Sequence, residues 1–310
     1  MANPETISLY EFFQRFPNEE AARKFFEGKR WADGVFCPHC GSLSASEVKD
    51  HKPMPYRCRD CRQHFSVRTG TVLAESRLPL HKWLMAIYMM TTARKGIPST
   101  QVARELGITQ KSAWFLCQRI RETWIAQNVE GDGGMGPVVE VDETYIGGKD
   151  KNRHGSKKQK VGGGSAGKAA VVGIRDRSGE VRAYPVERAT KAELQGFIRA
   201  HVKEGSMVYT DESPAYRFMY GYKHKAVNHS AGEFVNEMAH TNGIESFWAL
   251  LKRGYYGVYH YMSVKHLHRY VSEFSNRQTT RNFGTLSFMG DTAVRMVGRH
   301  ISYKELIGAR

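Results

Sequence analysis

Three polar residues near the end of the chain have the spacing of one helix face. In HTNGIESFWALLKRG, residues 240–254, a rotation of about 100° per residue groups Asn242, Glu245 and Lys252 together. The apolar side chains fall on the opposite side: Ile244, Phe247, Trp248 and Leu251. Amide and carboxylate oxygens suit a metal ion. The alternative is an ordinary amphipathic helix with a solvated polar face, so a chemical role requires carboxylates from elsewhere in the chain.

Two aspartates are candidates for those carboxylates. Asp142 lies in PVVEVDETYIGG, residues 137–148, whose alternation and β-branched residues predict a strand. Three side chains share one face of this strand: Glu140, Asp142 and Thr144. Asp211 follows MVYT, which predicts the end of a second, short strand. The adjacent acids Glu143 and Glu212 are weaker candidates, because Glu143 points to the other face of its strand.

A separate set of ligands lies near the N-terminus. Four cysteines form two CxxC motifs seventeen residues apart: Cys37, Cys40, Cys58 and Cys61. This spacing predicts one structural, four-thiolate zinc site, and the doubling of the motif favours zinc over two disulfides or a redox CxxC. His39 and His64 lie close by, but four cysteines already fill such a site. Cys117 lies among apolar neighbours and is expected to be a buried apolar residue.

A pair of helices follows the cysteine motifs. After a predicted helix over residues 80–92, Ser99 or Thr100 can cap one helix, Gly107 can form a tight turn and Thr109 can cap the next. This is the pattern of a helix-turn-helix. The residues that would approach DNA are Gln110, Lys111, Ser112 and Arg119. Many helical hairpins with a glycine turn bind nothing, but an arginine-rich zinc module beside this one favours DNA.

The element order of the second half predicts its fold. Residues 131–136 are a glycine-rich linker, which suggests domains at 1–75, 76–130 and 131–310. After the linker we expect strands at 137–148, 168–174 and 180–187, a helix at 191–202, strands at 207–209 and 222–228, and the helix at 240–254. That order is typical of a ribonuclease-H-like α/β fold, with a mixed sheet and flanking helices. In such a fold, carboxylates on two neighbouring strands and a later helix can converge.

The charge of the chain favours a polyanionic partner. Its 310 residues carry a formal net charge of +15, and no secretory signal or membrane-spanning run is present. We therefore expect a cytoplasmic, nucleoid-associated protein with no membrane partner. Residues 149–160 contain six Lys and Arg residues, among them Lys157 and Lys158. They suit a DNA backbone, although such a loop can also be simply solvated.

Several motifs together resemble a known family. VDETYIGGK, VYTDES and HTNGIESFWALLKRGYYGVYH, preceded by the two CxxC motifs, are similar to bacterial insertion-sequence transposases with an N-terminal zinc ribbon and a DD(N/E)K active site. The resemblance covers nearly the whole chain. It implies that Asp142 and Asp211 are the two aspartates and that Lys252 is the basic residue after the third member. Glu245 has the spacing of a DDE site, and Asn242 competes because one branch of the group uses Asn.

The resemblance also implies a reaction and its partners. Two Mg²⁺ or Mn²⁺ ions, held by Asp142, Asp211 and either Glu245 or Asn242, would support cleavage and strand transfer of double-stranded DNA. The partners would be the element ends and target DNA, with a homo-oligomer assembled on them. Two alternatives are a domesticated DNA-binding regulator and a structure-specific endonuclease of the same fold. The presence of all three acids argues against the first alternative.

Overall fold

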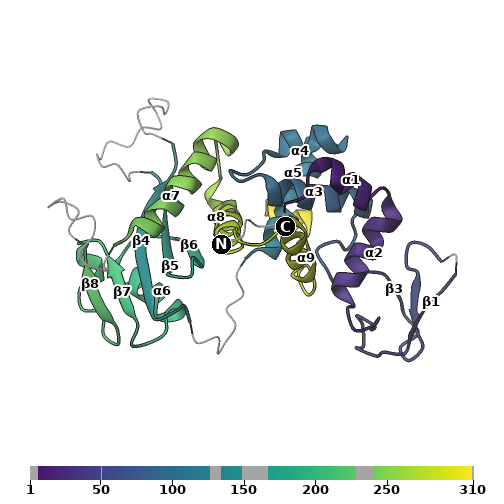
Figure 1. The fold of residues 1–310 in the computed structure, drawn as a ribbon, viewed down its shortest axis with the longest axis horizontal. Coiled ribbons are helices and arrows are strands. Elements are labelled where there is room, and N and C mark those ends of the chain that lie inside the picture. The colour runs from purple at the N-terminus through teal and green to yellow at the C-terminus, as the bar shows by residue number, and fades with distance from the viewer. Residues whose placement is uncertain (1–5, 50, 126–133, 149–166, 228–239, 309–310) are drawn as a thin grey trace. The chain divides into compact units, whose positions relative to one another are not determined.

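The computed structural model describes residues 6–49, 51–125, 134–148, 167–227 and 240–308 (Figure 1). The chain separates into two compact units, one of Met1–Trp124 with Asn282–Arg310 and the other of Ile125–Arg281. Residues 282–310 thus belong with the N-terminal part, whereas the sequence layout grouped them with residues 131–281. None of the helices in the described part of the chain is long and apolar enough to cross a membrane.

Two helices begin the first unit. α1 (Leu9–Arg15) starts with a capping box, in which Ser8 Oγ accepts the Glu11 N–H at 3.2 Å and Glu11 accepts the Ser8 N–H at 2.7 Å. α2 (Glu19–Arg30) starts at Asn18, whose side chain accepts a backbone N–H of the first turn. These caps replace hydrogen bonds that a helix N-terminus cannot make within itself.

A small antiparallel sheet carries the second CxxC motif. Its strands are β1 (Ala45–Glu47), β2 (Tyr56–Cys58) and β3 (His64–Phe65), in the order β1-β2-β3. The Trp31 ring lies edge-on to Tyr56 and Phe65, with centroid distances of 5.2 and 5.9 Å. All three rings are buried, so this sheet rests on an aromatic core at the end of α2.

The predicted helix-turn-helix is present as a helical pair. Three helices follow the small sheet: α3 (Leu80–Thr92), α4 (Ser99–Leu106) and α5 (Gln110–Thr123). Gly107 ends α4 in the left-handed conformation, with φ 57°, and Thr109 Oγ1 caps α5. The predicted cap of α4 is wrong: Pro98 takes the N-cap position, with no side-chain hydrogen bond, rather than Ser99 or Thr100. Proline fits there because its φ is fixed and it has no N–H to satisfy.

The C-terminal helices complete the first unit. α9 (Thr285–Val294) packs against α2 and α3, and Trp124 Nε1 donates to Thr292 Oγ1 at 3.0 Å. α10 (Tyr303–Ile307) follows and places the Tyr303 ring edge-on to Phe115 of α5. One continuous hydrophobic core joins the cysteine module, α3 to α5 and α9. The regions 1–75 and 76–130 therefore share a core.

The second unit is built on a five-stranded mixed sheet. Its strands are β4 (Val138–Ile146), β5 (Ala169–Asp176), β6 (Val181–Val186), β7 (Met207–Thr210) and β8 (Lys223–Ala226). Their spatial order is β6-β5-β4-β7-β8. The three strands that follow one another in sequence pair antiparallel, whereas β4 with β7 and β7 with β8 pair parallel. This confirms the predicted ribonuclease-H-like order, with β4 at the centre.

Helices cover both faces of this sheet (Figure 1). α6 (Lys191–His201) covers one face, where Val139 and Val141 of β4 pack against Leu194 and Ile198. α7 (Asn242–Gly254) and α8 (Val264–Thr279) cover the other face, in a separate core. Successive residues of β5 alternate between the two cores, because side chains alternate across a strand. The face under α7 is the face that carries Asp142.

Candidate functional site

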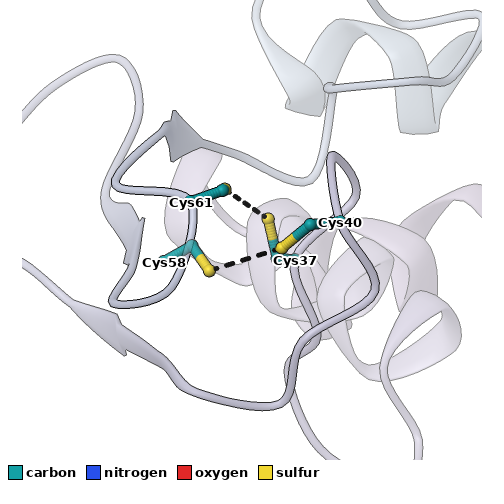
Figure 2. A group of neighbouring side chains, drawn as sticks. All are labelled: Cys37, Cys40, Cys58 and Cys61. Carbon is teal, nitrogen blue, oxygen red and sulfur yellow. Dashed lines mark hydrogen bonds between the residues drawn. The ribbon is translucent and has the colours of Figure 1, made fainter.

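The four cysteines converge on one point (Figure 2). Their ligand atoms all lie within 4.8 Å of one another, with Cys37 Sγ 3.6 Å from Cys61 Sγ and Cys40 Sγ 3.7 Å from Cys58 Sγ. A tetrahedral zinc with Zn–S bonds of about 2.3 Å requires sulfur–sulfur distances of about 3.8 Å. The cluster therefore fits a structural zinc ion, as the spacing predicts.

Backbone geometry prepares both cysteine turns for a metal. In each CxxC motif the residue after the second cysteine is left-handed, Gly41 with φ 76° and Arg62 with φ 60°. The Gly41 N–H donates to the Cys37 carbonyl at 2.8 Å, which closes the first turn. The backbone N–H of Cys61 holds the pKa of the Cys58 thiol down, at about 7. At Cys61, by contrast, a hydrogen bond from Gln63 is outweighed by burial and the neighbouring thiols, which raise the pKa to about 12, so a bound cation would be needed to favour the thiolate at all four positions.

Asp142 lies on β4, and Asp211 directly follows the neighbouring strand β7. β4 and β7 pair in parallel with Glu140 opposite Tyr209. Continuing this register by two residues places Asp142 opposite Asp211, the first residue after β7. The Asp211 side chain accepts the Ser213 N–H at 3.1 Å, so a tight turn follows the strand. This register sets the two predicted aspartates near one another, Asp142 on the central strand and Asp211 just after its neighbour.

α7 crosses β4 at Asp142. Trp248 Nε1 donates to Asp142 Oδ2 at 3.0 Å, and Asp142 Oδ1 accepts the Glu143 N–H at 2.8 Å. The indole lies over Gly173, the residue of β5 that pairs with Asp142. A Cβ at position 173 would stand 2.6 Å from the indole ring, so glycine provides the space that lets Trp248 reach the aspartate.

Burial and neighbouring negative charge raise the pKa values of two carboxylates in this region. Burial, then the negative charges of Glu143 and Asp211, raise the pKa of Asp142 to about 7. Burial also raises the pKa of Glu143, and Asp211 adds to that rise while a hydrogen bond from Tyr216 opposes it. A divalent cation would relieve this repulsion, and carboxylate oxygens are the ligands that Mg²⁺ and Mn²⁺ prefer. The donor set therefore fits such an ion.

α7 has the two faces that the sequence predicts. Its four apolar side chains are at most 4% exposed, whereas Asn242 and Glu245 are exposed and Lys252 is half-buried. Thr241 Oγ1 donates to Glu245 Oε1 at 2.8 Å. In the described part of the chain, the four cysteines form the only group of three or more Cys, His, Asp or Glu side chains whose ligand atoms lie within 4.8 Å of one another. Glu245 is therefore not gathered with both aspartates at that distance.

Two glutamates of β4 have surroundings that the sequence did not reveal. Glu143 points away from α7, as its place in the strand predicts, yet it is half-buried and accepts the Tyr216 hydroxyl at 2.5 Å. Tyr216 itself is fully buried in the core under α6. Glu140 is buried at 2% exposure and contacts the start of α7. Strand alternation gave the faces of both residues, but no sequence pattern gave these partners.

The predicted recognition residues differ in their accessibility. Gln110 and Lys111 are exposed at the start of α5, and the Lys111 ammonium lies 4.6 Å above the Tyr303 ring. Gln110 Nε2 donates to Ser99 Oγ at 3.2 Å. Ser112 is half-buried and donates its N–H to the Thr109 cap. Gln110 and Lys111 are thus accessible at the start of α5, while Ser112 contributes to the helix cap.

The expectation that Arg119 approaches DNA is wrong for this structure. Arg119 is 4% exposed, and its Nη2 donates to the Ala74 carbonyl at 2.6 Å. Its guanidinium also lies 5.2 and 5.1 Å from the rings of Trp83 and Phe115. Nine residues after the start of α5, the side chain has rotated into the core, where a carbonyl and two rings replace water. Lys157 and Lys158 lie outside the described residues.

The second unit has the fold class of the ribonuclease-H-like proteins, defined by its strand order, strand directions and flanking helices. Residues 133–279 match the family described as the ISXO2-like transposase domain, and residues 17–64 match the transposase zinc-ribbon domain. The chain belongs to the insertion-sequence transposases that carry these two domains.

Two comparisons with known proteins found sequences or structures similar to this chain. An uncharacterized protein in transposable element ISH50 of Halobacterium salinarum is 29% identical over 251 residues, which span 77% of this chain and 83% of that protein. A solved structure, the crystal structure of a pre-cleavage Mos1 transpososome, aligns with 70% of this chain and 79% of its own, at 12% identity and a TM-score of 0.20.

Proposed function

We propose that this transposase binds the ends of its insertion sequence and catalyses metal-dependent cleavage and transfer of DNA strands. The observation that carries the proposal is the parallel pairing of β4 with β7, a register that, continued by two residues, sets Asp142 opposite Asp211, beside the helix that carries Asn242, Glu245 and Lys252. The pKa of Asp142 also supports the proposal, since it is raised by burial and then by the charges of Glu143 and Asp211, and a bound cation would offset both.

Asp142 and Asp211 would hold two Mg²⁺ or Mn²⁺ ions. When bound, such ions polarise a phosphate and activate a water or 3′-hydroxyl for in-line displacement. Neighbouring residues of the protein hold the two aspartates in place through hydrogen bonds. Trp248 restricts one oxygen of Asp142 and the Ser213 N–H orients Asp211.

α7 would supply the third ligand and a phosphate contact. Glu245 adds a negative charge to the site, whereas Asn242 adds only a neutral carbonyl oxygen, so the two differ in how much charge they neutralise. Both are exposed on the first turn of α7. Lys252 lies two turns further along and would hold a phosphate as a point charge.

The first unit would bind DNA. The zinc ribbon and the helix-turn-helix share one core, so they would present a single, rigid recognition module. Gln110 and Lys111 at the start of α5 would reach the DNA, with Ser112 beside them. Lys157 and Lys158 would contact the backbone from the basic segment of the second unit. We also propose that the active form is a homo-oligomer assembled on the element ends.

A strand-transfer assay tests the catalytic part. Purified transposase is given labelled element ends, Mg²⁺ and target DNA, and cleaved and joined products are resolved. We expect Asp142→Ala and Asp211→Ala to abolish both products while end binding is unchanged; Glu187→Ala, an exposed acid just after β6, is the matched control. Cleavage without joining would identify a structure-specific endonuclease, and binding without cleavage would identify a DNA-binding regulator.

A comparison of two α7 variants identifies the third ligand. We expect one of Asn242→Ala and Glu245→Ala to lose cleavage and the other to keep most of it. Each variant is titrated with Mg²⁺, because loss of a ligand raises the metal concentration needed for activity. Full activity of both variants at the wild-type Mg²⁺ concentration would refute a third ligand on this helix.

A further inference from the structure

Glu140 is a charged residue buried beneath the start of α7. It lies on β4, two residues before Asp142 and on the same face, and is 2% exposed. Its Oε1 accepts Arg177 Nη1 at 2.7 Å and lies 3.3 Å from His240 Nδ1, while Oε2 accepts the Ile244 N–H at 2.9 Å. A buried carboxylate is stable only when it is paired in this way, so Glu140 is committed to these contacts.

The bond to Ile244 completes the N-terminus of α7. The first backbone N–H groups of a helix have no partner within the helix, and a side chain at the N-cap usually accepts one of them. At α7 the N-cap residue Thr241 makes no such bond, and its hydroxyl donates to Glu245 instead. The third N–H of the helix, that of Ile244, is satisfied from the sheet by Glu140. A carboxylate here also complements the positive end of the helix dipole.

Gly243 makes room for this cap. A Cβ at position 243 would stand 2.7 Å from Glu140 Oε2 and 2.5 Å from Arg175 Nη1. Both distances are shorter than a real contact allows, so any larger residue would displace the carboxylate or the guanidinium. The glycine in the first turn of α7 is therefore matched to the glutamate below it.

Two hydrogen bonds fix α7 along β4 with matching spacing. Glu140 holds the Ile244 N–H, and Trp248 holds Asp142. The two strand positions are about 6.6 Å apart at about 3.3 Å per residue. The two helix positions are about 6 Å apart at about 1.5 Å per residue. The helix therefore cannot slide along the strand without breaking both bonds.

We propose that Glu140 is a positioning residue that caps α7 from the sheet and sets where Asn242 and Glu245 stand relative to Asp142. The catalytic consequence rests on the proposed function, whereas the capping itself does not. Glu140 contacts neither DNA nor metal in this role; it acts through the helix.

Hydrogen exchange of the full chain, followed by mass spectrometry, tests the capping. In Glu140→Ala we expect exchange over residues 242–246 to rise at least tenfold, while peptides of β5 and α6 keep wild-type exchange. Glu140→Gln retains an oxygen acceptor and is expected to recover part of the protection. Glu187→Ala is the control and should match wild type throughout. Wild-type exchange over 242–246 in a folded Glu140→Ala protein would overturn the proposal.

A second variant covers the case in which Glu140→Ala does not fold. Gly243→Ala perturbs the same contact from the helix side, and alanine is compatible with a helix. It should give the same local rise in exchange; unchanged exchange would contradict the capping.

Cleavage kinetics then test the catalytic consequence. We expect Glu140→Ala to lower kcat for end cleavage about tenfold or more and Glu140→Gln to lower it less, with KM for the end unchanged in both variants, because the DNA-binding unit is untouched. A local exchange effect with wild-type kcat would refute positioning of the site. If the wild-type protein shows no cleavage while Glu140→Ala raises exchange over residues 242–246, the proposed function is refuted but the capping of α7 by Glu140 is supported.

Discussion

The contact between Gly173 and Trp248 gives a quantitative prediction about how the site is held together. Gly173→Ala places a Cβ 2.6 Å from Trp248 Cη2 and 2.7 Å from its Cζ2, with Ile244 Cδ1 at 3.1 Å. Carbon atoms prefer separations of about 3.5–4.0 Å, so the indole must move by about 1 Å. Both the indole and Ile244 are buried, so there is no free space to move into.

The expected cost follows from two opposing effects. Overpacking a well-packed core costs about 1–3 kcal/mol. Replacing glycine by alanine in a compatible backbone stabilises the fold by about 0.5–1 kcal/mol, because the unfolded chain has less conformational entropy to lose. Displacing the indole also weakens its bond to Asp142. We therefore expect Gly173→Ala to lower the free energy of unfolding of the second unit by about 1–3 kcal/mol.

Urea unfolding, read by hydrogen exchange in β4 and β5 peptides, measures this free energy for the second unit alone. Gly196→Ala is the matched control, because a Cβ at position 196 of α6 meets nothing within 4 Å. That change should be neutral or stabilising by up to about 1 kcal/mol.

A double-mutant cycle identifies the cause of the destabilisation. Trp248→Phe removes the ring atoms that Gly173→Ala strikes, so we expect the two changes together to destabilise less than their sum, by about 1–2 kcal/mol. Equal stability of Gly173→Ala and Gly196→Ala, or strict additivity in the cycle, would show that residue 173 and the Trp248 ring are not in the tight contact described.

Three further predictions concern the first unit. Cys37→Ser should release the zinc and unfold the cysteine module, and elemental analysis showing one zinc per chain would contradict this. Glu19 caps α3, since its carboxylate accepts the Leu80 and His81 N–H groups at 2.8 Å. Glu19→Ala should therefore lower the free energy of unfolding by about 1–2 kcal/mol in thermal or urea denaturation, and an unchanged midpoint would exclude a stabilising role of Glu19 at the start of α3. Lys111→Ala should leave the fold intact. It should reduce by about one the slope of the logarithm of the DNA-binding constant against the logarithm of salt concentration, and an unchanged slope would exclude a phosphate contact by Lys111.

Much of the fold follows from local pattern. Strand alternation and helical periodicity gave the element order of the second unit, and the CxxC spacing gave the cysteine cluster. The turn at Gly107 followed because only a residue that tolerates positive φ can end α4 in that way. These features depend on neighbours in sequence, so a single sequence contains them.

The features that the sequence did not yield depend on tertiary contact. The inward rotation of Arg119 is fixed by the Ala74 carbonyl, forty-five residues away. Residues 282–310 joined the first unit because α9 packs on α2 and α3, a long-range pairing with no local signal. Glu140 belongs to the predicted face of β4, but its partner is an N–H on a helix more than a hundred residues later.

The most direct test of the central claim is end cleavage by isosteric variants of the two aspartates. Asp142→Asn and Asp211→Asn keep side-chain size but remove the charge that a metal site requires. We expect each to lower the cleavage rate by about a thousandfold or more at unchanged end binding, which corresponds to about 4 kcal/mol of lost transition-state stabilisation. Cleavage at the wild-type rate by either variant would contradict a catalytic centre built on Asp142 and Asp211.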